Sequence, residues 1–448
     1  MKSKDVVVIG AGLVGSLLSI YLRRHGHKVR VFERRNDLRR SHINAGKSIN
    51  LALSDRGWNP LAEVGLETLL KQMVIPMEGR LMHDLEGRLT FQPYGKQGQT
   101  INSISRGGLN ALLMNKAEEM GVNFYFEQRC THVDLDRTTA TFSGRENGKD
   151  VQADLIFGAD GAFSAVRESF QHTERFNYSQ EYIPHGYKEL RISSSPDHGF
   201  LIDKNALHIW PRGDFMLIAL PNLDASFTVT LFLPFEGESS FASLTSEEHI
   251  DQFFQKYFAD TLPLMPSLKQ DFFQNPTSSL VTVRSYPWVR NRTTLIGDAA
   301  HAIVPFYGQG MNCGFEDCGV LNKLMEQNGD DWECVLHSFQ ELRKPDADAI
   351  AHFALKNFIE MREKVGEKDF LLRKKIEAML QNYFPDRWIP QYSMVTFQPD
   401  MRYSRALKIA NLQDLVLEKS LRNLKDEQSF SRKEGKFIVE ELERQLRD

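Results

Sequence analysis

The chain has 448 residues, of which 41% are hydrophobic and 25% charged, and its formal net charge is −4. This length is enough for two or three domains, and the composition is ordinary for a globular protein. The small negative charge argues against a nucleic-acid-binding surface, and no apolar run approaches the roughly 18 residues that a membrane-spanning helix needs. The four cysteines have no zinc-type spacing, so we expect no metal site and reduced thiols.

The first predicted strand, Val6 to Ile9, ends at the motif Gly10-Ala-Gly12-Leu-Val-Gly15. Its apolar run is typical of a buried parallel strand, and apolar residues at helical spacing follow the motif. In such a motif the first glycine permits a tight turn, the second lets backbone approach a pyrophosphate, and the third lets the helix pack closely on the strand. A second strand ends at Glu33, near the expected position of the acid that binds a ribose hydroxyl. Together these features predict a dinucleotide-binding unit.

A helix from Arg106 to about Met120 and a strand from Val122 to Phe126 extend the predicted parallel sheet. A further strand over residues 154–158 ends in Asp160-Gly161, and Ser164 then resembles a helix N-cap. Asp-Gly is a common turn signal by itself. Its place between two other nucleotide-type motifs favours a strand-to-helix switch that binds a ligand.

Between residues 178 and 282 the pattern changes to alternating, β-rich runs at 206–210, 215–220 and 227–233. Glycine and proline separate these runs, as in an antiparallel sheet. We expect this region, together with residues 76–99, to form a substrate domain.

An apolar run at 293–296 leads into Gly297-Asp298, and a glycine-rich turn over 305–310 precedes a predicted helix. An acid after a strand can accept hydrogen bonds from sugar hydroxyls, and a helix start presents free N–H groups to an electron-rich ligand. This combination suits a flavin. If the stretch stood alone, an ordinary strand, turn and helix would explain it better, and the two earlier motifs decide for the flavin.

From residue 331 onward the pattern is helical and rich in charge, which favours solvated helices that cover the core. The predicted fold class is therefore α/β. A Rossmann-like FAD-binding domain is built from residues 1–75, 100–172 and 284–328, with an inserted, mainly antiparallel β-sheet substrate domain from 76–99 and 178–282. A helical C-terminal region spans 331–448.

The three motifs in this order resemble the FAD-dependent aromatic hydroxylases that have a single nucleotide-binding domain. The resemblance implies that the glycine motif and Glu33 hold the ADP half of FAD, and that Asp160-Gly161 lies near both FAD and NAD(P)H. No second glycine motif follows a strand, so no separate NAD(P)H domain is expected. The implied cofactor-binding residues are Gly10, Gly12, Gly15, Glu33, Arg106, Asp160, Gly161, Asp298, Gly310, Met311 and Asn312.

Further blocks resemble the members of that family that hydroxylate L-kynurenine; they cover residues 46–57, 75–80, 93–95, 306–318, 357–362 and 392–397. The resemblance runs from residue 5 to about 405. It implies that the substrate carboxylate is held by Arg80, Tyr94, Asn357 and Tyr392. A guanidinium grips a carboxylate through two charge-assisted hydrogen bonds, and phenols and an amide add donors without net charge. Taken singly, the arginine would also fit a surface ion pair and each tyrosine an ordinary half-buried ring.

The implied reaction is the hydroxylation of L-kynurenine to 3-hydroxykynurenine in tryptophan degradation, with FAD, NADPH and dioxygen, through a flavin hydroperoxide. The predicted catalytic residues are Pro305, Phe306 and Tyr307, which are expected beside the reactive edge of the flavin, although relatives vary at the last position. His301 is not expected to be catalytic. The ring amino group of kynurenine activates the attacked carbon, so the protein needs no acid–base pair and must chiefly orient the substrate and exclude water.

Three other hypotheses stay open at this stage. The chain could be an FAD-dependent hydroxylase of another aromatic acid, a flavin-dependent halogenase or reductase, or a flavin-binding scaffold without activity. The halogenase motif Trp-x-Trp-x-Ile-Pro is absent from the sequence. Animal and fungal relatives carry a hydrophobic C-terminal anchor that the charged C-terminus here lacks, so we expect a cytoplasmic enzyme without a membrane anchor. A homodimer is left open.

Overall fold

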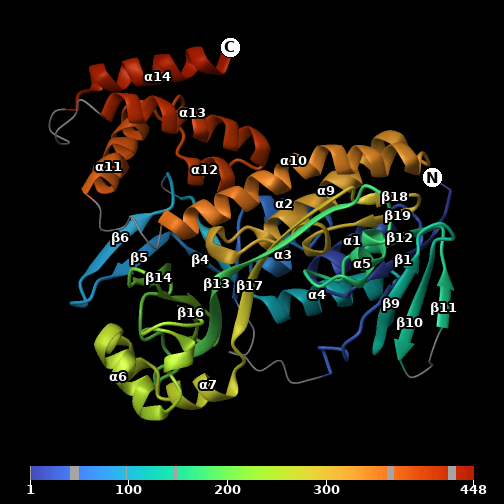
Figure 1. Cartoon of the computed structure of the whole chain (residues 1–448), viewed down its shortest axis with the longest axis horizontal. Helices are drawn as coiled ribbons and strands as arrows, with labels where there is room; N and C mark the ends of the chain where they lie inside the picture. Colours follow the sequence, from blue (N-terminus) through green and yellow to red (C-terminus); the bar gives the residue numbers. More distant parts are fainter. Residues whose placement is uncertain are drawn as a thin grey trace.

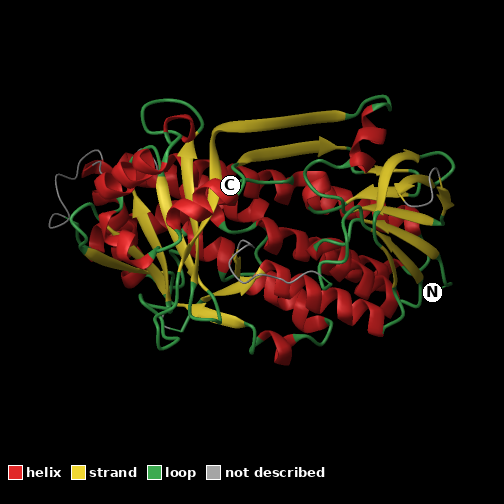
Figure 2. Cartoon of the chain, turned by 90° about the horizontal axis from the view of Figure 1, so that it is seen from below, coloured by secondary structure: helices red, strands yellow, loops and turns green. Residues whose placement is uncertain are grey.

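The computed structural model describes residues 2–40, 50–96, 98–144, 149–360, 368–421 and 430–447. Two large sheets lie at opposite ends of the molecule, with helices between them (Figure 2). In Figure 1 the first sheet is on the right, the second is at the lower left, and the last helices of the chain, α11 to α14, gather at the upper left. The predicted fold class, with its parallel sheet, antiparallel sheet and C-terminal helices, is confirmed.

The first sheet has six strands in the order β18-β19-β12-β1-β2-β8 and is parallel except at β18. Helices α4 and α9 both pack against α1 beside it. The apolar run of β1 is buried, as expected for a strand covered on both faces. The strands are β1 (Asp5–Ile9), β2 (Lys28–Phe32), β8 (Asn123–Tyr125), β12 (Leu155–Gly158), β18 (Val289–Arg290) and β19 (Thr293–Leu295), and the helices are α1 (Leu13–Arg24), α4 (Arg106–Glu119) and α9 (Gly310–Asn328).

The second sheet has seven strands in the order β17-β13-β16-β15-β14-β5-β6, and only the β14–β5 pair is parallel. One face packs against α6 (Glu247–Tyr257) and α7 (Leu268–Gln274) in a separate apolar core. The three alternating runs of the sequence form β14, β15 and β16, as predicted. The strands are β5 (Gly79–His83), β6 (Leu89–Pro93), β13 (Asn177–Ile192), β14 (Ala206–Pro211), β15 (Met216–Pro221), β16 (Phe227–Pro234) and β17 (Ser278–Tyr286).

Two three-stranded antiparallel sheets complete the β structure, in the orders β3-β7-β4 and β11-β10-β9. The second of them lies within the segment predicted to bind FAD, and helix α5 packs against its strand β9. The elements are β3 (Asn50–Leu53), β4 (Val74–Met77), β7 (Ile101–Ser105), β9 (Gln128–Asp134), β10 (Thr139–Gly144), β11 (Lys149–Gln152), α2 (Asp55–Glu63), α3 (Glu67–Leu70) and α5 (Ala165–Gln171). The segment 76–99 divides between two sheets, and the domain limits given above stay a prediction.

Beyond residue 331 the described chain is helical, as predicted. Helix α10 packs against α9 and α13, and α13 packs against α14. The helices are α8 (Asp298–His301), α10 (Trp332–Ile359), α11 (Lys368–Tyr383), α12 (Gln391–Thr396), α13 (Tyr403–Leu421) and α14 (Arg432–Arg447). Among the described helices, none is both long and apolar enough to cross a lipid bilayer.

Candidate active site

A cavity of about 670 Å³ lies between the two large sheets and is lined by residues of both. One end is formed by the turn after β1 and the end of β2. The other end is formed by Arg80, Tyr94 and Tyr392. The loop from Ile303 to Met311 lines the cavity between these two ends.

The turn after β1 accepts only glycine at two of its three motif positions. Gly10 has a φ of +107°, and a Cβ there would lie 2.4 Å from the Ala159 carbonyl oxygen. A Cβ on Gly15 would lie 2.0 Å from the Gly10 oxygen, so the helix could not pack on the strand. At Gly12 nothing lies within 4 Å of a built Cβ, and no side chain caps the start of α1. The residues therefore fit a pyrophosphate held against open backbone at a helix N-terminus.

Glu33 follows β2 and faces the same end of the cavity. Its carboxylate accepts hydrogen bonds from the Ala11 N–H at 3.0 Å and the Arg35 N–H at 2.9 Å, and it pairs with the Arg35 guanidinium at 2.8 Å. Burial alone would raise the pKa of Glu33, but these bonds lower it overall. The side chain is therefore an ionised acceptor, which suits a ribose hydroxyl.

The other predicted FAD residues have different environments. Asp160 accepts hydrogen bonds from the Ser164 hydroxyl at 2.5 Å and the Ala165 N–H at 2.7 Å, so it caps α5, and burial raises its pKa. Ser164 is itself the predicted N-cap. Asp298 is exposed at the start of α8 and lines the cavity, as do Arg106 and Gly161.

Asn312 does not line the cavity. Its side chain is fully buried, donates to the Ala52 and Gly308 carbonyls at 2.9 and 2.8 Å, and accepts from the Ser54 N–H at 3.0 Å. It therefore fastens the glycine-rich loop to the end of β3. Gly310 and Met311, the two residues before it, do line the cavity at the start of α9.

At the opposite end, Arg80 lies in an aromatic cage. Its guanidinium carbon is 4.6 Å from the centre of the Tyr392 ring and 5.7 Å from that of Tyr94, and these two rings stack at 5.6 Å. The Tyr307 ring lies 5.4 Å from Tyr392. Burial raises the pKa of all three phenols, so they are neutral donors. Burial alone would lower the pKa of Arg80, but the phenols raise it overall.

Within the described part of the chain, Arg80 has no carboxylate as a partner, and its electrostatic neighbours are tyrosines. A cation in this setting is available for an anionic ligand, because a buried charge is otherwise costly unless it is paired. The structure thus brings together three of the four predicted substrate residues.

The fourth, Asn357 of α10, lies behind the loop. Its side-chain amide donates to the Phe306 carbonyl at 2.7 Å, and it is not part of the cavity wall. The Phe306 ring packs between Phe232 and Phe358, at 5.0 and 4.5 Å. Asn357 therefore supports the turn Pro305–Tyr307, all of which lines the cavity.

The sequence reasoning missed the wall between the two ends. Alternate residues of three neighbouring strands face the cavity, and Ile209, Ile218 and Thr230 lie side by side in register. The period of two along a strand would have identified this face. The wall residues are Leu207, Ile209, Met216, Ile218, Leu220, Thr230 and Phe232.

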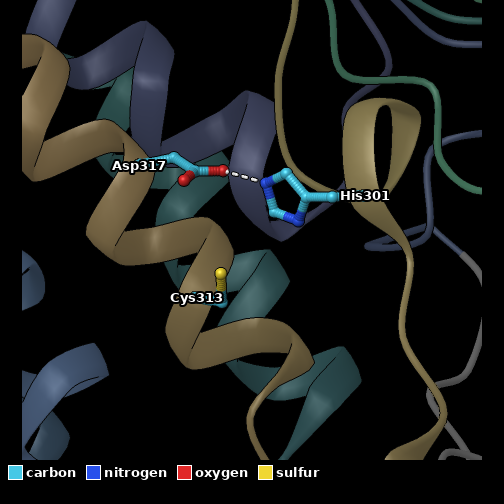
Figure 3. A group of neighbouring side chains, drawn as sticks. All are labelled: His301, Cys313 and Asp317. Atoms are coloured by element: carbon cyan, nitrogen blue, oxygen red, sulfur yellow. Dashed lines mark hydrogen bonds and ion pairs between the residues drawn. The ribbon is translucent and has the colours of Figure 1, made fainter. Parts of the chain in front are cut away.

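The loop from Ile303 to Met311 is predicted to face the flavin and is called the flavin loop. A buried group beside this loop has the composition of a metal site (Figure 3). His301 Nε2 lies 2.7 Å from an Asp317 oxygen, and these residues and Cys313 have ligand atoms within 4.8 Å of one another. However, the Arg343 guanidinium donates to Asp317 at 2.7 Å and to the Cys313 sulfur at 3.3 Å. Burial also raises the pKa of the Cys313 thiol. Arg343 thus supplies the positive charge that a metal ion would otherwise bring, and the arrangement favours an ion-pair network over a metal centre. His301 is held by this network through its contact with Asp317.

Comparisons with known proteins agree with this geometry. A family model described as FAD binding domain matches residues 3–354. The kynurenine 3-monooxygenases of Christiangramia forsetii and Flavobacterium johnsoniae are 51% and 50% identical to this chain, and each alignment covers 94% of both proteins. The kynurenine 3-monooxygenase of Dictyostelium discoideum is 44% identical and covers 93% of both.

Solved structures of similar fold include 2-methyl-3-hydroxypyridine-5-carboxylic acid oxygenase. Its TM-score is 0.67 at 20% identity, and the match covers 82% of this chain and 94% of that one. PqsL of P. aeruginosa in complex with 2-aminobenzoylacetate has a TM-score of 0.66 at 18% identity, covering 81% and 97%. At these identities the likeness shows the fold alone.

Proposed function

The chain belongs to the FAD binding domain family and, within it, to the kynurenine 3-monooxygenases, and we propose that its cavity hydroxylates L-kynurenine to 3-hydroxykynurenine with FAD. The observation that carries this proposal is the pairing of two features in one cavity. A glycine cradle for a dinucleotide lies at one end. At the other end an arginine, which has no acidic partner among the described residues, lies among neutral phenols.

The nucleotide end binds and orients the cofactor. The open backbone at Gly12 and the start of α1 would hold the pyrophosphate, and Glu33 would accept from a ribose hydroxyl. Asp298 and the start of α9 would face the rest of the cofactor. When bound, FAD supplies the redox chemistry that activates dioxygen and delivers one oxygen atom to the substrate ring.

The substrate end binds the amino-acid part of kynurenine. Arg80 would grip the carboxylate through two parallel hydrogen bonds, and the Tyr94 and Tyr392 phenols would donate to the same group. This anchoring places the aromatic ring along the apolar strand wall, against Phe232 and the Phe306 turn. The wall excludes water, which protects the reactive oxygen from being lost to solvent.

NADPH is our proposed electron donor, and its support is the family to which the chain belongs. The proposal also places the protein in the cytoplasm, where the free thiols of its four cysteines would persist.

A substrate panel tests this proposal. NADPH consumption and hydroxylated product are followed together with L-kynurenine, with kynuramine, which lacks the carboxylate, and with 4-hydroxybenzoate. We expect 3-hydroxykynurenine in proportion to the NADPH used, and weakening of about 100-fold for kynuramine, because it loses the charge-assisted pair with Arg80. NADH in place of NADPH is the control for the donor.

Two results would contradict the proposal. Hydroxylation of the benzoate in preference to kynurenine would favour the hydroxylase of another aromatic acid. NADPH consumption that no aromatic compound stimulates would leave a flavin-binding protein without this activity.

A further inference from the structure

A chain of buried ion pairs runs from the turn Gly297–Asp298, called the flavin-facing turn, toward α12, the short helix that carries Tyr392. At its first end, Asp317 of α9 accepts a hydrogen bond from the Gly297 N–H at 3.2 Å and pairs with His301 at 2.7 Å (Figure 3). Gly297 precedes Asp298, which lines the nucleotide part of the cavity. The Asp317 carboxylate therefore fixes the turn that presents Asp298.

The middle of the chain consists of one arginine and one glutamate. Arg343 of α10 donates from Nε to Asp317 and from Nη1 to Glu316, both at 2.7 Å. The other Glu316 oxygen accepts from Arg56 Nη1 at 2.7 Å. Glu316 thus lies between two guanidiniums and uses one oxygen for each. The Arg343 and Arg56 side chains are 2% and 0% exposed.

At its second end, Arg56 holds the end of α12. Its Nε donates to the Val395 carbonyl at 2.5 Å, and its Nη2 donates to the Gln398 carbonyl at 3.0 Å and to the Met401 carbonyl. Val395 lies in the same short helix as Tyr392, which contacts Arg80 in the substrate cage. A shift of α12 would therefore break several bonds to a fully buried cation.

A second contact strengthens this connection. The Tyr403 ring packs 4.0 Å from the Arg56 guanidinium carbon, and its hydroxyl donates to the Gln309 side chain at 2.8 Å. Gln309 belongs to the flavin loop and lines the cavity. Removing one partner of a buried ion pair leaves an uncompensated buried charge and is strongly destabilising, so the connected parts are expected to move together.

We propose that Glu316 is a positioning residue that joins the flavin-facing turn to α12, so that FAD and kynurenine each favour the binding of the other through this chain. The inference rests on the proposed function. Glu316 is not part of the cavity wall in the described structure. A change there therefore tests the ion-pair chain separately from any direct contact between substrate and cofactor.

The experiment compares FAD release from the holoenzyme, measured by flavin fluorescence on dilution, without and with saturating L-kynurenine. The ratio of the two FAD dissociation constants is the coupling factor, which by thermodynamic linkage applies equally to both ligands. We expect a factor of at least about fivefold in the unmodified protein. Glu316→Gln should lower it to less than about twofold. The FAD constant without kynurenine should change less than about threefold, because Glu316 does not line the cavity.

Glu326→Gln is the matched control, because Glu326 is an exposed residue of the same helix and accepts a hydrogen bond from Asn322. Its coupling factor should equal that of the unmodified protein. If Glu316→Gln does not fold, Glu316→Asp keeps the charge but is too short to reach both arginines, and the same loss of coupling is expected.

The outcomes are distinct. If kynurenine does not bind the unmodified holoenzyme, the proposed function fails and the inference fails with it. If kynurenine binds but the coupling factor is one, or is unchanged in the Glu316 variants, only the inference is overturned. If both variants lose FAD without kynurenine present, Glu316 has a structural role alone, and the inference is likewise overturned.

Discussion

The two ends of the cavity are built in different ways. The nucleotide end is made of backbone and glycine, contributed by a continuous segment around Gly10 to Gly15 and supported by Glu33. The substrate end is made of side chains from distant segments, because Arg80 comes from β5 and Tyr392 from α12. The shape of the nucleotide end follows from a short local segment of the chain. The substrate end forms only when segments distant in the sequence come together.

This difference predicts which kind of substitution abolishes ligand binding at each end of the cavity. A backbone cradle is destroyed by adding a side chain, because the space next to the glycines is either filled by the protein or needed by the ligand. A side-chain cage is destroyed by removing one group, because its members are proposed to bind a single ligand carboxylate. Substitutions of opposite kinds therefore test the two ends.

The largest effect is expected at Gly15. A Cβ there would lie 2.0 Å from the Gly10 oxygen, so Gly15→Val should cost more than about 5 kcal/mol and leave no folded protein. Gly12→Val should behave differently, because its Cβ meets nothing within 4 Å and its φ of −73° suits any residue. We expect that variant to fold and yet to bind no FAD. Circular dichroism and flavin absorbance of the purified variants measure the two results.

A yellow, FAD-replete Gly12→Val protein would contradict the assignment of this cradle to the pyrophosphate. Gly26→Ala is the control for glycine replacement at the opposite end of α1, because nothing lies within 4 Å of its Cβ and it does not line the cavity. Its φ of +83° predicts a loss of roughly 1–2 kcal/mol, well below that at Gly15.

Most of the nucleotide end could be predicted from the sequence because its geometry is local. Gly10, Gly12 and Gly15 are close in the chain, and the turn that they form follows from the strand before them and the helix after them. Glu33 is placed by the next strand. The alternation in β14 to β16 could likewise have revealed the strand wall, since a period of two determines which residues share a face.

The substrate end could not be derived in this way. Arg80, Tyr94 and Tyr392 were identified by resemblance, since no local pattern brings them together. The direction of a side chain also depends on tertiary packing, which explains why the sequence did not predict the contacts of the Asn312 and Asn357 side chains. Both were expected at a ligand. Their side-chain amides donate to loop carbonyls, and their ligand-binding roles stay predictions. The first of the matching blocks, residues 46–57, is described only from residue 50, so residues 46–49 lie outside the described structure.

The next largest effect is expected at Arg80. Arg80→Ala should weaken kynurenine binding by about 100-fold, or roughly 3 kcal/mol, because the carboxylate loses its charge-assisted partner. Arg80→Lys should recover part of this loss, since an ammonium keeps the charge but not the two parallel hydrogen bonds. FAD content should be unchanged in both variants. Titration of the holoenzyme with kynurenine, followed by flavin absorbance, measures these affinities.

Arg88→Ala is the matched control, because Arg88 lies just before the adjoining strand β6, is 76% exposed and pairs with Asp84 at the surface. It should bind kynurenine as the unmodified protein does. Equal weakening in the Arg88 and Arg80 variants would mean that damage to the strand pair, rather than loss of the anchoring group, explains the effect.

The smallest effect concerns pH, and it distinguishes a neutral cage from a titrating one. Burial raises the pKa of Tyr94, Tyr307 and Tyr392 above their ordinary value, and the pKa of Arg80 is also raised. As pH rises, Arg80 therefore stays positively charged and the three phenols stay protonated. The phenols lose their protons only above the ordinary phenol pKa of about 10. The affinity for the deaminated analogue 3-(2-aminobenzoyl)propionate, which has no α-amino group to titrate, should change less than about twofold between pH 6.5 and 9.5.

A tenfold loss of affinity for this analogue by about pH 9 would mean that a phenolate forms beside the bound carboxylate. Tyr94→Phe then identifies the group responsible. The variant should bind about five- to tenfold more weakly, because it lacks one donor worth roughly 1 kcal/mol, and its pH profile should stay flat. If the unmodified protein loses affinity with pH and the variant does not, Tyr94 titrates within the binding range. The substrate end would then depend on the protonation state of its side chains as well as on their positions, a sensitivity that a cradle of backbone and glycine cannot have.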